Sequence, residues 1–218
     1  MPTSLTNLLE DLEDPFSFFP IQSVSQSLQQ LVESAGEDFH SRMGPNGVAR
    51  KYWDVPSELL YEEIGLLIGA AFVLGQAMIT QTISIIKKIQ ELTSQTSGLP
   101  DGKATILCFR ASSNERSGIS HPCIVDLAAN YFKHHNEWSE GWALCDGRGL
   151  QKRTIEGCLA VGMSPRRDVT DNMFAALNAL GNHSNSVQSI QASIEQWREG
   201  LARHLYAALE IDDPKLQG

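Results

Sequence analysis

Apolar residues recur at steps of three and four along most of the chain, which is the spacing of one face of a helix. The first run covers residues 5–12 and stops before Pro15. A second run covers residues 24–35 and stops before Gly36. These two runs predict two helices in the N-terminal part of the chain.

The longest apolar run predicts a helix over residues 57–95, a stretch that contains no proline. One helix of that length would measure roughly 60 Å. Residues 64–86 carry no charge, which is also typical of a membrane span. However, polar residues step along one face from Gln76 to Lys87, so we predict the central helix of a soluble bundle and no membrane association.

The spacing Gly65-x-x-x-Gly69 lies within this run. Small residues four apart let two helices approach closely, in a soluble bundle as well as in a membrane. The sequence therefore predicts that another helix crosses close to these glycines.

Residues 105–109 form the best short strand in the sequence, and residues 48–53 are its candidate partner. Four further helices are expected after them. Ser120 and Pro122 start one helix, a short helix covers residues 154–161, and Asp168 caps a helix that Gly181 ends. The last helix, residues 186–209, has a coiled-coil-like apolar seam.

The predicted fold class is all-α, an antiparallel helical bundle with one long central helix and a small two-stranded β element. We expect a single helical domain over residues 1–218, in which an acidic N-terminal segment, 1–55, packs on the bundle formed by 56–211. Residues 1–63 contain eleven acids and three bases, whereas the rest of the chain is nearly balanced, so most of the net charge of −9 lies at the N-terminal end.

Cysteine spacing, the N-terminal sequence and the net charge indicate the compartment of the protein and the partners it disfavours. The four cysteines are spread out without a Cys-x-x-Cys pair, and the N-terminus lacks the pattern of a signal peptide, which together favour reduced thiols in a cytoplasmic protein. A net charge of −9 disfavours non-specific binding to nucleic acid. The basic residues between 147 and 167 form either a solvated loop or a local site for a phosphate or an acidic partner surface.

The most distinctive polar pattern is on the helix that follows Pro122. Asp126, Asn130 and His134 lie four residues apart and share one face, and Glu137 continues the stripe. A carboxylate beside an imidazole suits general acid–base catalysis. The same stripe also fits a polar face that ties this helix to the central one, and the sequence leaves both interpretations open.

At these residues the chain resembles the HEPN superfamily, helical bundles that include many prokaryotic RNases of toxin and defence systems. Members commonly carry an Arg, often followed by Asn, then three residues and a His. Residues 129–134 match the Asn and the His, but Ala129 stands at the Arg position. The resemblance implies a catalytic role for His134 and, for Asn130, the polar position beside the missing Arg, and the stripe adds Asp126 as a third candidate catalytic residue. The candidate phosphate-binding cations are Lys133, Arg148, Lys152 and Arg153.

Two other Arg-to-His spacings exist, Arg116 to His121 and Arg198 to His204. Only the first lies at a helix start, where an anion could meet free N–H groups. The histidines and cysteines match no zinc-binding spacing, so no metal or cofactor is predicted.

Two functions therefore remain. One is a HEPN-like protein that binds or cleaves RNA or nucleotides in a prokaryotic stress or defence module. The other is a non-enzymatic helical module that binds a protein partner, or itself as a homodimer, through its long helices.

Overall fold

The computed structural model describes residues 4–13, 19–43, 55–93, 98–138, 142, 150–181 and 186–211. These residues form an all-helical fold with one long central helix, as the sequence predicts. The helices are α1 (Leu5–Glu13), α2 (Phe19–Met43), α3 (Val55–Leu92), α4 (Lys103–Cys108), α5 (His121–His134), the short 3-10 helix η2 (His135–Glu137), α6 (Leu150–Ala160), α7 (Val169–Ala179) and α8 (Gln188–Ala208).

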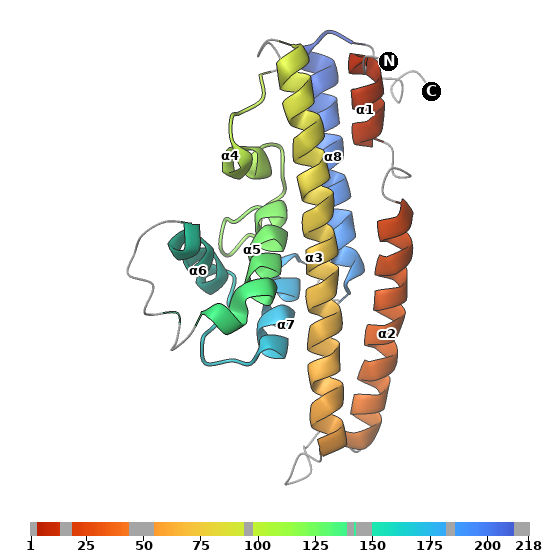
Figure 1. Cartoon of the computed structure of the whole chain (residues 1–218), viewed down its shortest axis with the longest axis vertical. Helices are drawn as coiled ribbons and strands as arrows, with labels where there is room; N and C mark the ends of the chain where they lie inside the picture. The colour runs from red at the N-terminus through yellow and green to blue at the C-terminus, as the bar shows by residue number, and fades with distance from the viewer. Residues whose placement is uncertain are drawn as a thin grey trace.

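Helix α3 is continuous and forms the axis of the molecule (Figure 1). It buries residues spaced by three and four along one side, among them Ile64, Ile68 and Phe72, which confirms the helical reading of this run. Helices α2 and α5 run antiparallel to α3, whereas α7 and α8 run parallel to it (Figure 1). The helices around α3 therefore include both parallel and antiparallel neighbours.

Helix α8 lies behind the upper half of α3 (Figure 1). The apolar seam predicted for this helix is buried within the chain at Val187, Ile190, Ile194, Trp197, Leu201 and Leu205. The indole N–H of Trp197 also donates to the carbonyl of Phe109 at 3.2 Å. Because the seam already forms part of the core, a homodimer would need a different surface.

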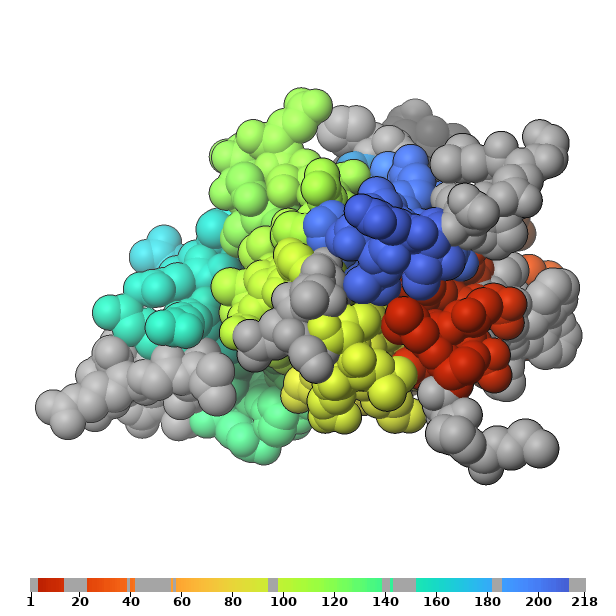
Figure 2. All heavy atoms as spheres, turned by 90° about the horizontal axis from the view of Figure 1, so that it is seen from above, coloured from red at the N-terminus to blue at the C-terminus, as the bar shows by residue number. Residues whose placement is uncertain are grey.

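The N-terminal helices pack on this core. Leu8, Leu9 and Leu12 of α1 are buried, and α1 lies against the upper ends of α3 and α8 (Figure 2). Helix α2 packs mainly on α3. Its Gln29 side-chain oxygen accepts a hydrogen bond from the backbone N–H of Val187 at 2.8 Å and so holds the start of α8.

The predicted strand at residues 105–109 is wrong, because this segment lies in helix α4 and the turn after it. Ile106 and Leu107 are adjacent and both buried, which a strand with one buried face does not allow. A five-residue apolar run is too short to distinguish the two periods. The candidate partner, residues 48–53, lies outside the described residues, in which the β pairing is one isolated bridge between Ser113 and Ser120.

The predicted helix starts at Ser120 and Asp168 are confirmed. Ser120 is the N-cap residue of α5, and the Asp168 carboxylate accepts a hydrogen bond from the N–H of Asp171 at 2.7 Å at the start of α7. Gly181, with φ of 90°, follows the last turn of α7. Helix α6 begins at Leu150, four residues before the predicted start.

In the described part of the chain, residues 58–92 of α3 are long and apolar enough to cross a membrane, with a mean hydropathy of 1.7 in the most apolar window. Half of that window is buried inside the fold. Core helices of soluble proteins share these properties, so length and composition alone do not assign α3 to a membrane.

Candidate functional site

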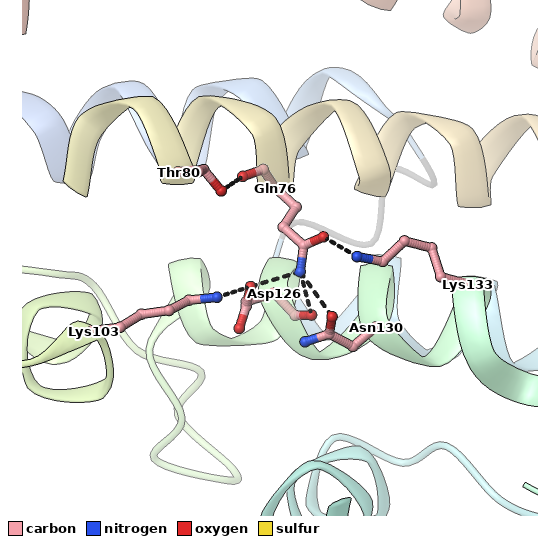
Figure 3. Close-up of polar contacts among 6 residues, drawn as sticks. All are labelled: Gln76, Thr80, Lys103, Asp126, Asn130 and Lys133. Carbon is pink, nitrogen blue, oxygen red and sulfur yellow. Dashed lines mark hydrogen bonds and ion pairs between the residues drawn. The ribbon is translucent and has the colours of Figure 1, made fainter. Parts of the chain in front are cut away.

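A polar cluster joins α3 to α5 and centres on Gln76 (Figure 3). The amide nitrogen of Gln76 donates to Asp126 Oδ1 at 2.7 Å and to Asn130 Oδ1 at 3.0 Å. The Gln76 amide oxygen accepts from Lys133 Nζ at 2.6 Å. On the other flank, Lys103 Nζ of α4 forms an ion pair with Asp126 Oδ1 at 2.6 Å. Three of these side chains contact the Gln76 amide, and Lys103 joins the cluster through Asp126.

Local sequence explains why the cluster forms. Asp126 and Asn130 are four residues apart on α5, so both face α3. The glycine before Gln76 brings the two helices close, since a Cβ at Gly75 would lie 2.9 Å from a methyl of Val125. The Asp126 side chain is only 16% exposed, and Lys103 balances its charge. The cluster therefore ties α5 to α3, the second of the two interpretations of the stripe.

His134 lies apart from this cluster. Its side chain is 47% exposed, and its Nδ1 is 3.1 Å from Oε1 of Glu137. Among the described residues, the structure brings Asp126, Asn130 and Lys133 together through Gln76, but His134 contacts Glu137 instead. His134 and Glu137 are thus an imidazole and a carboxylate in contact with each other and accessible to solvent.

The neighbouring residues of this motif have structural contacts. Tyr131 is buried, and its hydroxyl accepts a hydrogen bond from the Asn172 side chain of α7 at 2.9 Å. The Tyr131 ring lies 5.4 Å from each of the Trp138 and Trp142 rings. Phe132 fills the space over Gly69, where a Cβ would lie 2.2 Å from the Phe132 ring. Much of the stretch that resembles the HEPN motif is therefore a packing junction.

The predicted phosphate-binding cations lie in several places. Lys133 is bound to Gln76, whereas Lys152 and Arg153 are exposed on α6. Lys152 pairs with Glu156 of the same helix at 3.8 Å. Arg148 lies outside the described residues. The structure thus does not bring Lys152 or Arg153 into the polar cluster.

A cavity of about 820 Å³ brings Arg116 and His121 together beside the ends of α6 and α7 and the side of α8. The backbone N–H of Arg116 donates to Asn114, and burial lowers the pKa of His121. Arg198 differs from this pair, because it is only 3% exposed and donates to the carbonyl of Asp11 at 2.8 Å. It has a structural role within the core.

Sequence reasoning missed an acidic groove of about 660 Å³ beside the N-terminal half of α3. The acidic groove is defined by side chains from α3, η2 and the start of α7: Glu58, Tyr61, Glu62, Leu66, His135, Asp168, Val169, Thr170 and Asp171. Its α3 carboxylates, Glu58 and Glu62, are among the eleven acids of residues 1–63. The two aspartates come from a region about a hundred residues later, and only the fold brings them to the same place.

The acidic groove carries more negative than positive charge. Glu58, Glu62, Asp168 and Asp171 are all exposed, and within the described ranges none of them forms an ion pair. The hydroxyl of Tyr61 donates a hydrogen bond to Asp171. Burial, and next this hydrogen bond, raise the pKa of Tyr61 well above its usual range, so Tyr61 stays protonated.

The residues that the structure describes contain no group of three or more His, Cys, Asp or Glu side chains suited to hold a metal ion. No family model, curated protein or solved structure matches this chain. The HEPN resemblance therefore stays a prediction. A function for this chain has to be inferred from the contacts and charges of its own residues.

Proposed function

We propose that this chain is a non-enzymatic helical module that binds a basic, amphipathic segment of a partner protein in the acidic groove. The observation that carries the proposal is the combination of four exposed carboxylates with apolar side chains in one hollow. Leu66 is 58% exposed, and Leu59, about two turns nearer the start of α3, is 60% exposed. Exposed apolar side chains rimmed by charge are typical of interaction sites.

The chemistry of the occupant follows from this combination. The four carboxylates repel one another, although Arg167 lies near enough to act on Tyr61. Lysine or arginine side chains of a partner would relieve the remaining repulsion. Leu66 and Val169 offer an apolar floor for the other face of the same segment. An amphipathic helix with one basic and one apolar face meets both requirements.

The polar cluster supports a binding role over catalysis at Asp126 and Asn130. Both side chains are engaged by the Gln76 amide, and the Asp126 charge is paired with Lys103. A general base must reach a substrate proton, which a carboxylate held by two partners within a helix contact does poorly.

The test is the binding of a fluorescent helical peptide of alternating leucine and lysine faces, followed by anisotropy at moderate salt. Reversal of one groove charge, Glu62→Lys, should weaken binding by about tenfold, since like charges at a contact cost more than 1 kcal/mol. The matched control is Glu91→Lys, which makes the same charge change on an exposed residue at the other end of α3.

Equal weakening by Glu62→Lys and Glu91→Lys would contradict the proposal, because the peptide would then respond only to the net charge of −9. Absence of binding, or equal binding of a peptide with glutamates in place of the lysines, would contradict it as well.

A second candidate is HEPN-like binding or cleavage of RNA, which the exposed His134 and Glu137 pair favours. His134 has the exposure that proton transfer requires, and Glu137 orients its ring. The experiment incubates a single-stranded RNA with the chain and with His134→Ala. Loss of cleavage in His134→Ala, with the fold intact, would favour this candidate, whereas equal activity of both proteins would exclude His134 as the catalytic residue.

A further inference from the structure

Two cysteines face each other where α4 meets α5. Cys108 is the last residue of α4, and Cys123 lies in the first turn of α5, fifteen positions later. Their sulfur atoms are 3.7 Å apart. A disulfide bond measures about 2.05 Å, so the sulfurs need to approach by only about 1.7 Å, which side-chain rotation can supply.

The segment between the cysteines holds them in this position. The Ser120 hydroxyl donates to the carbonyl of Leu107 at 2.9 Å and also contacts the Cys108 sulfur at 3.8 Å. Within the connecting loop, the N–H of His121 donates to the carbonyl of Ser112 at 2.9 Å. The contact between the two sulfurs is therefore part of the folded arrangement of α4 and α5.

We propose that Cys108 and Cys123 form an oxidation site, at which peroxide converts the two thiols to a reversible disulfide that fastens α4 to α5. Cys108 is exposed and Cys123 is half-buried, so peroxide from solvent reaches Cys108 first. Cys158 is buried away from solvent. The proposal does not depend on the partner-binding function.

The reaction balances with hydrogen peroxide as the oxidant. The Cys108 sulfur attacks one peroxide oxygen, the O–O bond breaks, and one water leaves, which gives a sulfenic acid at Cys108. The Cys123 sulfur then attacks the Cys108 sulfur, so that the S–S bond forms while the S–O bond breaks. The Cys123 proton leaves with the hydroxyl group as a second water.

The order in which the two cysteines react agrees with the surroundings of their thiols. Burial raises the pKa of the Cys123 thiol to about 12, so Cys123 remains protonated near neutral pH. A protonated, half-buried thiol reacts slowly with peroxide, so Cys108 is oxidised first. The resolving step proceeds through the small thiolate fraction of Cys123, and the sulfur–sulfur distance of 3.7 Å favours it.

The disulfide would strengthen a contact that also supports the polar cluster. Lys103 of α4 pairs with Asp126 of α5, three residues after Cys123. A covalent bond between the same two helices would hold Lys103 in place against Asp126. We therefore expect oxidation to raise the thermal unfolding midpoint by about 5 °C or more.

The test treats the reduced full chain with hydrogen peroxide, blocks the remaining thiols, and maps the peptides by mass spectrometry. The expected product is a single peptide pair joined through Cys108 and Cys123, which dithiothreitol separates. Cys108→Ser should abolish the crosslink. The matched control, Cys145→Ser, changes a cysteine outside the described residues and should leave the crosslink intact.

Three results would overturn the proposal. The first is Cys108 oxidised to a sulfinic acid while Cys123 remains a free thiol. The second is a crosslink from Cys108 to Cys145 or to a second molecule. The third, a disulfide that leaves the unfolding midpoint unchanged or lower, would refute the fastening of α4 to α5.

Discussion

On the side of α3 that faces α5 and α7, glycines allow contacts so close that one added carbon would clash. A Cβ at Gly65 would lie 2.9 Å from the backbone Cα of Thr170. On the other side, α2 buries Leu28 and Val32, yet Leu31 stays 51% exposed, and a Cβ at Gly36 would meet nothing within 4 Å. The contact of α3 with α5 and α7 depends on exact shape complementarity, whereas its contact with α2 depends on apolar burial.

The difference shows which contact specifies the position of a helix. Apolar burial tolerates small shifts, because it is roughly proportional to the area removed from water. A close glycine contact and a polar cluster tolerate few shifts, since a displacement creates a clash or an unpaired polar group. The positions of α5 and α7, which carry His134 and part of the acidic groove, are therefore set more sharply than that of α2.

The largest expected effect tests this contrast directly. Gly65→Ala should lower the free energy of unfolding by about 2–3 kcal/mol, because its methyl group would overlap Thr170. Gly36→Ala, the control in α2, should leave stability unchanged or raise it by up to about 1 kcal/mol. Urea unfolding followed by tryptophan fluorescence measures both. Equal effects of the two variants would show that the two sides of α3 are packed alike.

A smaller effect is expected from the polar cluster. Gln76→Ala should lower the free energy of unfolding by about 1–2 kcal/mol, because it removes the amide that joins Asn130 and Lys133. Gln81→Ala, on the exposed face of the same helix, should change it by less than about 0.5 kcal/mol. A loss no greater than that of Gln81→Ala would mean that the cluster does not stabilise the α3–α5 contact.

The smallest effect concerns the end of α5. His134→Ala, the variant already described for the RNA assay, should change the free energy of unfolding by less than about 0.5 kcal/mol, because its exposed pair with Glu137 is screened by water. The same urea titration measures it. A large loss of stability would show that His134 belongs to the tightly packed contact of α3 with α5 and α7.

Part of the candidate site could be predicted from the sequence. The four-residue spacing of Asp126 and Asn130 placed both side chains on one face of a helix, and that face does contact the central helix. The sequence places the partner, Gln76, on a polar stripe but does not pair it with Asp126 or Asn130. The sequence does not identify Lys103 as the cation, because it begins α4, a segment whose short apolar run predicts a strand.

The sequence by itself determined most of the helices and their buried sides, because these depend on periodicity and on residues close together in the chain. It did not determine α4, which it predicts as a strand, or the ends of α2, which continues through Gly36 to Met43. The tertiary structure alone decided three juxtapositions: Gln76 with Asp126, Cys108 with Cys123, and Glu62 with Asp168 across the acidic groove. Each joins residues of different helices. An apolar repeat of three and four residues defines the buried face of one helix. Which face of another helix it contacts depends on how all the helices pack together in one core.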